Sequence, residues 1–363
     1  MHLVFVMLGA VRPSVALATA LIALECAHTG LGKESGGVRM VTAAQRLALI
    51  RHAQVWRKTD VSAVDIKAGP QSKDTFAPDA TITCDYANET LGGHTPKFAC
   101  AIDKEDHLKI RYGRNNGEVY AGVAATRLLW ALGFGADAMY PVHVVCRGCP
   151  DAMKQEGEAG PGYIRFDIAA IDRKMPGQEV EAPSVGAGWS WEDLDLVDER
   201  EGGAPLAHRD ALKLLAVLVQ HTDNKPDQQK LLCLGEHAKH GDCREPFMMA
   251  HDVGQTFGAA NLFNRGSIGS VNLEHWSRTP VWKDPIHCFG NLAPSQTGTL
   301  SNPHISEAGR KFLADELMQL TDVQIRDLFT VARFADKPGG SPVDAWVAAF
   351  KHKREEIASA TCH

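Results

Sequence analysis

Two aspartates on short polar loops are the residues of this chain best suited to chemistry. Asp223 lies within Gln220–Gln228, directly after a long apolar run, and Asp252 lies between an apolar segment and Gly254. Phosphoryl-transfer sites use one Asp to orient the attacking hydroxyl and a second, in Asp-x-Gly, to hold metal against the phosphates. A further metal ligand comes five positions after the first Asp, which is Gln228 here. The pattern predicts a catalytic Asp223 with Asp252 and Gln228 as metal ligands.

Three features upstream are suited to binding the phosphates of a nucleotide. Gly92 and Gly93 form a turn before a short apolar run, where backbone N–H groups can approach phosphate oxygens because no side chain intervenes. Lys109 lies in an alternating segment that predicts a strand, from which it would contact phosphates. Glu118 opens a predicted helix that continues to Leu132, and it could pair with Lys109.

Each of these residues also has an ordinary structural explanation. Asp223 could be a turn acid at a helix end, and Lys225 could either neutralise the transferring phosphoryl group or be a solvated loop lysine. Gly92-Gly93 is compatible with a plain hairpin turn. Glu118 is compatible with simple complementation of the helix dipole. The order of the features, rather than any single one, favours the catalytic interpretation.

That order resembles the HipA-type bacterial kinases, which are distant relatives of the phosphatidylinositol kinases and the secretory-pathway kinases. The segment Gly92–Phe98 resembles their Gly-x-x-Pro-Lys phosphate loop, and Lys109 matches their nucleotide-contacting lysine. The segment Thr126–Gly133 resembles the Arg-Leu-x-x-x-Leu-Gly helix end of that family. Asp223 matches its catalytic Asp, and Asp252 matches its metal-binding Asp.

The resemblance covers roughly residues 88–260, and the chain departs from the family pattern at two positions. Gln228 stands where the family has Asn, and its longer side chain could weaken a Mg²⁺ site that demands octahedral geometry. Gly122 stands where the family usually has its helix glutamate, and Glu118 lies about one turn earlier.

The resemblance implies an α+β, bilobal, protein-kinase-like fold with a small mixed-sheet N-lobe and a mainly helical C-lobe. It also implies ATP and Mg²⁺ as cofactors, and a kinase activity whose acceptor is a protein hydroxyl. Two alternatives remain open. One is a degenerate kinase-like module that binds without turnover, and the other is a secreted protein stabilised by disulfides or zinc, without nucleotide chemistry.

Apolar periodicity and turn residues suggest how the chain is organised. An amphipathic helix is expected at 41–58, a buried helix at 207–220, and capped helices after Ser306 and Thr321. The Gly/Glu-rich segment 154–162 is a candidate lobe boundary. The expected parts are a leader at 1–27, a helical extension at 28–80, the N-lobe at 81–155 and the C-lobe at 156–363.

Composition restricts the class of protein. The 363 residues are 44% hydrophobic and 23% charged, which is ordinary for a soluble globular protein. The net charge of −6 argues against a nucleic-acid partner. The two apolar pieces near the N-terminus are interrupted at Arg12, so a leader is favoured over a stable membrane span. The protein would be exported or periplasmic if the leader is real, and cytoplasmic otherwise.

Nine cysteines provide several pairing options. Cys84 and Cys100 flank the glycine pair, Cys233 and Cys243 flank a polar turn, and both pairs are candidates for hairpin disulfides. Cys146-x-x-Cys149 is compatible with half a zinc site, a redox pair or a disulfide. A structural zinc is not expected, because the segment around His237, His240 and Cys243 lacks a second motif with zinc-ligand spacing.

Overall fold

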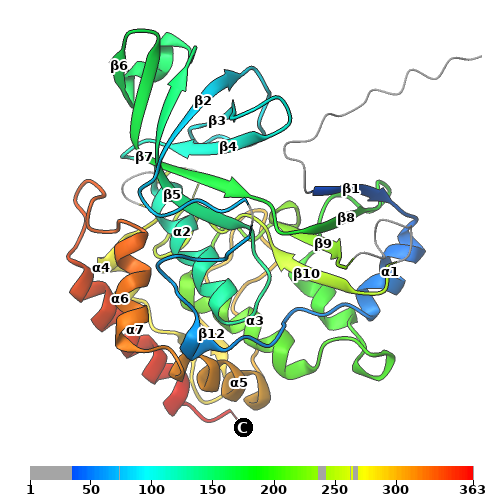
Figure 1. The fold of residues 1–363 in the computed structure, drawn as a ribbon. Coiled ribbons are helices and arrows are strands. Elements are labelled where there is room, and N and C mark those ends of the chain that lie inside the picture. Colours follow the sequence, from blue (N-terminus) through cyan, green and yellow to red (C-terminus); the bar gives the residue numbers. More distant parts are fainter. Residues whose placement is uncertain (1–34, 73, 236–242, 262, 265–268, 363) are drawn as a thin grey trace, which may run out of the picture. The chain divides into compact units, whose positions relative to one another are not determined.

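A closed barrel of short strands carries the upstream residues of the candidate site (Figure 1). The computed structural model describes residues 35–72, 74–235, 243–261, 263–264 and 269–362. The strands follow the order β4-β3-β2-β5-β7-β6, and an additional pairing of β4 with β7 closes the sheet. Only the β2–β5 pairing is parallel among these. The strands are β2 (Thr81–Ala87), β3 (Lys97–Ala101), β4 (His107–Tyr112), β5 (Ala138–Arg147), β6 (Glu158–Gly160) and β7 (Tyr163–Arg173).

The barrel interior is apolar, and this decides which side chains of β4 face the site. Leu108, Ile110 and Tyr112 belong to the buried barrel cluster. Because successive side chains of a strand point to opposite faces, Lys109 and Arg111 lie together on the outer face. The same cluster contains the disulfide Cys84–Cys100 and the Cys146 end of Cys146–Cys149.

Helix α2 (Gly117–Ala131) packs on the barrel strands β4, β5 and β7 and on helix α6 (Asp322–Val331). The side chain of Asn116 caps its N-terminus by accepting a hydrogen bond from Glu118 N. A Cβ on Gly122 would lie 2.4 Å from Met139 Sδ, so the helix approaches β5 too closely for a side chain there. Gly122 is therefore a packing position, and the acidic residue of this helix lies one turn earlier, at Glu118.

A second sheet carries the two loops that hold the aspartates. It consists of β1 (Ser35–Met40), β8 (Gly177–Glu181), β9 (Gln229–Cys233) and β10 (Pro246–Ala250), in the order β1-β8-β9-β10. The β1–β8 pairing is parallel and the others are antiparallel. The disulfide Cys233–Cys243 ties the hairpin of β9 and β10. Asp223 lies before β9 and Asp252 lies after β10.

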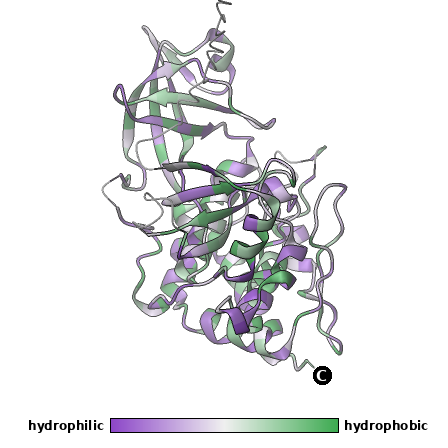
Figure 2. Cartoon of the chain, turned by 90° about the vertical axis from the view of Figure 1, so that its right-hand side faces the viewer, coloured by the Kyte–Doolittle hydropathy of each residue, from purple (hydrophilic) through white to green (hydrophobic). Residues whose placement is uncertain are grey.

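The remaining elements are mostly helical. Helix α3 (Leu206–Val219) is buried along most of its length, and the left-handed backbone of its C-cap residue Gln220 (φ 56) turns the chain toward Asp223. The helices are α1 (Ala43–Arg51), α3 (Leu206–Val219), α4 (Leu273–Arg278), α5 (Glu307–Met318), α6 (Asp322–Val331) and α7 (Val343–Ser359). Short 3-10 helices are η1 (Val61–Ala63), η2 (Asp151–Gln155), η3 (Trp191–Leu196), η4 (Glu199–Glu201) and η5 (Pro226–Gln228), and a small hairpin comprises β11 (Trp282–Asp284) and β12 (Phe289–Gly290). The helices carry both hydrophobic and hydrophilic residues (Figure 2), as expected for elements with one buried face.

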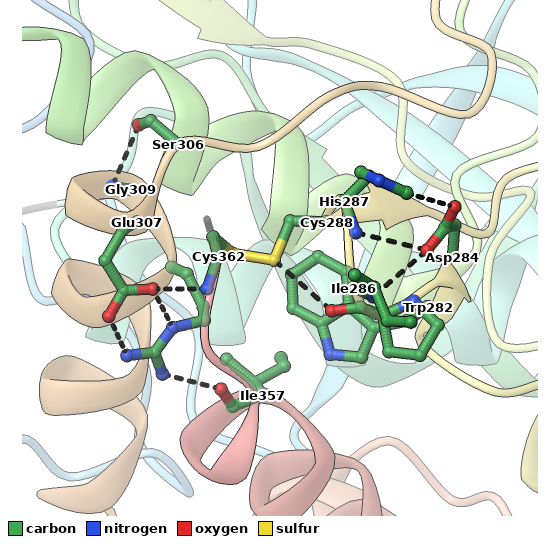
Figure 3. Close-up of a disulfide and its surroundings, with 12 residues drawn as sticks. Trp282, Asp284, Ile286, His287, Cys288, Ser306, Glu307, Gly309, Ile357 and Cys362 are labelled. Carbon is green, nitrogen blue, oxygen red and sulfur yellow. Dashed lines mark hydrogen bonds and ion pairs between the residues drawn. A yellow bond between two sulfur atoms is a disulfide. The ribbon is translucent and has the colours of Figure 1, made fainter.

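The tail that follows α7 is tied back to the β11–β12 hairpin by the disulfide Cys288–Cys362 (Figure 3). Glu307 accepts a hydrogen bond from Cys362 N (3.0 Å) and two from the Arg310 guanidinium. Arg310 in turn donates to the carbonyl of Ile357 (2.8 Å) near the end of α7. This disulfide joins cysteines 74 residues apart, and the sequence did not indicate it.

The α+β class is confirmed, as are the disulfides Cys84–Cys100 and Cys233–Cys243 and the caps at Ser306 and Thr321. The helix expected at 41–58 is shorter, ending at Arg51, after which the chain is held by isolated bridges. Among the described residues, none of the helices is long and apolar enough to cross a membrane.

The expected domain limits stay predictions, although their positions in the fold can be stated. The limit between 155 and 156 falls within the barrel, because β6 and β7 pair with the strands before it. The segment 154–162 contains the end of η2 and the strand β6, next to β7. The described residues belong to one compact unit. The expected leader at 1–27 lies outside the described residues.

Candidate active site

Arg111 joins three carboxylates that come from distant parts of the chain. Its Nη1 lies 2.5 Å from Glu118 Oε2, its Nη2 lies 2.8 Å from Asp252 Oδ2, and its Nε lies 3.4 Å from Asp172 Oδ2. The arginine side chain is only 2% exposed. Burial alone would lower the pKa of Arg111, but the three carboxylates outweigh it and raise this pKa above its usual value.

Asp252 is held at this arginine by the turn that follows it. Gly254 N donates to Asp252 Oδ1 at 3.3 Å. A Cβ on Gly254 would lie 2.9 Å from Glu118 Cβ, so only glycine lets the turn approach helix α2 this closely. Burial raises the pKa of Asp252, but Arg111 and Lys109 outweigh burial and hold that pKa well below the usual range. The Asp-x-Gly spacing therefore places a carboxylate that is ionised at physiological pH against α2.

Lys109 pairs with Asp172, at a distance of 2.5 Å, while Glu118 pairs with Arg111. The partner of Glu118 is thus Arg111, two residues further along β4, and not Lys109 as expected. The strand register explains this difference, because Lys109 lies opposite Asp172 on β7. Arg111 lies nearer to the start of α2. Thr95 adds a second contact to Glu118, as its hydroxyl donates to Oε2 at 2.7 Å.

The glycine pair Gly92-Gly93 lies next to a third cation of the site, Lys97. Gly93 has a left-handed backbone (φ 84), and a Cβ there would lie 2.6 Å from Lys97 Nζ, whereas Gly92 borders open space. Lys97 lies opposite Arg111 in the β3–β4 ladder. Burial and repulsion by Arg111 lower the pKa of Lys97. Within the described part of the chain, the ion pairs of this site involve Arg111 and Lys109, and none involves Lys97.

Asp223 lies beside two amide side chains. Gln228 Nε2 donates to Asp223 Oδ2 at 3.3 Å, and Gln255 Nε2 donates to the same oxygen at 3.4 Å. Burial raises the pKa of Asp223; the charge of Lys225 opposes this increase, but the nearby carboxylate of Asp252 adds to it, and the pKa is raised overall. Lys225 lies 3.7 Å from Asp227 Oδ2 on the same loop. Asp223 is therefore a partly buried carboxylate with a stronger affinity for protons than an exposed aspartate has.

The loop that carries Asp223 is fixed by neutral groups. The buried Asn224 side chain donates to His221 O (2.9 Å) and accepts from Leu300 N (2.9 Å). His221 is itself 1% exposed and lies against the ring of Trp191. Burial lowers the pKa of His221 to about 4, so the ring is neutral at physiological pH. Pro226 then starts the short helix η5, which ends the loop.

A cavity of about 470 Å³ opens next to this network. Lys109, Asp172 and His251 line it together with aromatic and apolar side chains, which are Trp130, Phe134, Tyr140, Met175 and Pro176. Its size lies within the range of small-molecule sites. His251 contacts Asp137 at 2.6 Å, and this contact outweighs burial and raises the pKa of His251. A larger cavity of about 790 Å³, between α1 and η4, includes none of these residues.

The residues near Asp252 are compatible with a magnesium ion. Mg²⁺ is usually held by one or two carboxylates together with substrate phosphates, rather than by a complete protein cage. Asp252 supplies such a carboxylate, and the side chain of Gln228 supplies an amide oxygen. The two residues are adjacent, because the backbone carbonyl of Gln228 accepts a hydrogen bond from Asp252 N at 3.2 Å. Across the ranges that the structure describes, no group of three His, Cys, Asp or Glu side chains could hold a metal by itself.

The structure brings most of the predicted residues to one place. Asp223, Gln228, Asp252 and Glu118 are joined by the contacts above, while Lys225 contacts Asp227. Sequence reasoning missed three residues of the network, which are Lys97, Arg111 and Asp172. The signal for Lys97 was its place in the Gly-x-x-Pro-Lys segment itself, and the signal for Arg111 was the two-residue period that puts it on the same face as Lys109.

Comparisons with known proteins give little further information about the function of this site. No family model matches the chain, and no curated protein matches it. Among solved structures, the chain is similar to the crystal structure of the proinflammatory kinase CtkA of Helicobacter pylori, with a TM-score of 0.41 and 11% sequence identity. That similarity covers 78% of this chain and 95% of the other. A likeness of this strength supports no conclusion about this chain, so its function is argued from the site alone.

Proposed function

We propose that this protein is a kinase-like phosphotransferase that transfers the γ-phosphoryl group of ATP to a hydroxyl, with a protein as the acceptor. The observation that carries this proposal is the buried Arg111, which joins Glu118 and Asp252 beside the partly buried Asp223. Phosphoryl transfer requires cations for the phosphates, a carboxylate for the metal and a carboxylate for the attacking hydroxyl. All three lie in this network.

In this proposal the fold has two lobes, with the barrel as the N-lobe and the helical part as the C-lobe, as in HipA-type kinases. The nucleotide base enters the cavity of about 470 Å³, whose apolar walls include Trp130, Phe134 and Met175. Lys109, which lines that cavity, then lies between the base and the phosphate-binding cations.

Each residue has a defined task. Lys97, next to Gly93, binds phosphate oxygens. Arg111 contributes a second positive charge and positions Asp252. Asp252 and Gln228 would hold Mg²⁺, which would neutralise charge on the phosphates. Asp223 orients the acceptor hydroxyl and accepts its proton, and its raised pKa suits a proton acceptor better than an ordinary aspartate would.

A phosphoryl-transfer assay with two aspartate variants tests the proposal. Asp223→Asn should lower the turnover of a generic protein acceptor or of ATP hydrolysis by roughly 10²–10⁴-fold, because the proton acceptor is lost. Asp227→Asn is the matched control, as this residue lies on the same loop but is 55% exposed. Equal turnover in the two variants would contradict the role of Asp223.

One observation favours a second candidate, a kinase-like module that binds nucleotide without turnover. The long side chain of Gln228 reaches Asp223 and donates to it, where a shorter Asn would be expected to leave Asp223 free. Gln228→Asn distinguishes the two candidates. A rise in turnover indicates an enzyme weakened by the longer side chain. Nucleotide binding without turnover in both the natural protein and this variant indicates the binding module.

A further inference from the structure

The barrel contains two disulfides that lie next to each other. Cys84 on β2 and Cys146 on β5 are direct partners in the parallel register. Cys84 is bonded to Cys100, and Cys146 is bonded to Cys149. Side chains at register partners lie on the same face of adjacent strands, about 5 Å apart. The Cys84 and Cys146 side chains therefore lie side by side in the barrel interior, where both are fully buried.

The two disulfides differ in access and in loop length. Cys84, Cys100 and Cys146 are 0% exposed, whereas Cys149 is half-buried at the barrel surface. Cys146–Cys149 has a sequence separation of 3, compared with 16 for Cys84–Cys100, 10 for Cys233–Cys243 and 74 for Cys288–Cys362. Because the stabilisation by a disulfide grows with the length of the loop that it closes, the shortest loop is the least strongly held.

We propose that Cys146–Cys149 is a thiol–disulfide exchange site, with Cys84–Cys100 as its internal partner. This proposal does not depend on the proposed phosphotransferase activity. The external reactant is a dithiol, either a small molecule or the reduced active site of a thiol oxidoreductase.

The exchange consists of a reduction by the external dithiol, followed by an isomerisation within the barrel. A thiolate of the external dithiol attacks Cys149 Sγ, the Cys146–Cys149 bond breaks, and Cys146 leaves as a thiolate. The second thiol of the reagent resolves the mixed disulfide, so that the reagent is oxidised to its disulfide and Cys149 is released as a thiol. Cys146 then attacks Cys84 Sγ, forming Cys84–Cys146 and releasing Cys100 as a thiolate. The second step is an isomerisation that consumes no further reductant.

The product changes the connection between barrel strands. Cys84–Cys100 joins β2 to the antiparallel strand β3, whereas Cys84–Cys146 would join β2 to β5. Strand β3 begins at Lys97, below the glycine pair. The exchange would therefore free β3, which carries Lys97, from its disulfide bond, while the new Cys84–Cys146 bond would still join β2 to the barrel.

Graded reduction of the full chain with dithiothreitol, followed by alkylation and peptide mass spectrometry, tests the first step. Cys149 should be alkylated at reductant concentrations at least tenfold lower than those needed for Cys233 or Cys288. Free Cys100 should appear together with Cys149, while Cys84 stays protected. Reduction of Cys146–Cys149 only together with or after the other disulfides would overturn the proposal.

Two serine variants test the isomerisation. Cys149→Ser leaves a Cys146 thiol beside Cys84–Cys100, so non-reducing peptide mapping should find a Cys84–Cys146 linkage and a free Cys100. Cys146→Ser leaves the thiol at the barrel surface, so Cys84–Cys100 should stay intact. An intact Cys84–Cys100 bond in both variants would refute the internal partner. If either variant fails to fold, the appearance of free Cys100 in the natural chain decides the question.

Discussion

The barrel supplies the three cations of the site together with the carboxylate of Asp172, the loops of the second sheet supply two further carboxylates, and the two regions are organised by different forces. The barrel supplies the cations Lys97, Lys109 and Arg111, which are placed by strand register, and the last two are fixed by ion pairs. The loops supply Asp223 and Asp252. The Asp223 loop is fixed mainly by neutral contacts, in which Asn224 and His221 are buried.

The contact between Arg111 and Asp252 joins these two regions. On the barrel side, loss of one charge leaves its partners buried without compensation, which is expensive. On the Asp223 loop, the anchoring groups carry no charge, so the loop is insensitive to a lost ion pair but sensitive to protonation of a buried neutral ring. We therefore expect charge substitutions to lower stability mainly through the barrel side, and acid to lower it mainly through the Asp223 loop.

Replacing the barrel's central cation should produce the largest effect on stability. Arg111→Met leaves Glu118 and Asp252 without their main cation, so the free energy of unfolding should fall by about 3–5 kcal/mol in chemical denaturation. Arg147→Met is the matched control, because Arg147 pairs with Asp85 on the same barrel but is 57% exposed. Its cost should be about 0–1 kcal/mol. Similar costs for the two variants would show that the buried network is not what holds the barrel side together.

Acid should destabilise the region of the Asp223 loop through His221. The folded protein keeps His221 neutral until its pKa of about 4, whereas the unfolded chain protonates it near the usual value of 6.5. The unfolded state therefore binds more protons in this window, and the free energy of unfolding falls as the pH drops from about 6.5 to about 4. At 1.36 kcal/mol per pKa unit, the loss amounts to roughly 3 kcal/mol.

Denaturation of His221→Met at several pH values measures this contribution. The variant should lack this part of the acid sensitivity, so its stability relative to the natural chain should improve steadily between pH 6.5 and pH 4. His352→Met is the control, because His352 is 72% exposed and should change the pH profile little. An unchanged pH profile in His221→Met would mean that this ring is protonated readily in the folded protein.

Lys97 should affect nucleotide binding more than stability, since the ion pairs of the site are made by the other two cations. Lys97→Met should weaken the affinity for ATP by about tenfold, the equivalent of one charge-assisted hydrogen bond of about 1.5 kcal/mol. Lys104→Met, on the exposed β3–β4 turn, is the matched control and should leave the affinity unchanged. Equal affinities in both variants would remove Lys97 from the phosphate site.

Local patterns were sufficient for much of the fold. Alternation predicted the strand that contains Lys109, and apolar periodicity predicted the buried helix that ends near Gln220. The capping residues Ser306 and Thr321 were visible because a cap depends on residues three positions apart. The two hairpin disulfides were also local, since both pairs are less than 20 residues apart.

The pairing of charges could not be predicted in the same way, because it depends on contacts between distant segments. The partners of Arg111 lie 7, 61 and 141 residues away, and the choice between Lys109 and Arg111 depends on the register of β4 against β7. The close approach of Gly122 to Met139 likewise requires knowledge of how α2 packs on the barrel. The disulfide between Cys288 and Cys362 requires the path of the C-terminal tail.

Isothermal titration with a non-hydrolysable ATP analogue, with and without Mg²⁺, tests the central claim most directly when the natural chain and Asp252→Ala are compared. We expect magnesium-dependent binding to the natural chain and loss of that dependence in the variant, while the fold persists because Arg111 keeps Glu118 and Asp172. The absence of binding to a well-folded natural chain would contradict the claim that these charges form a nucleotide site.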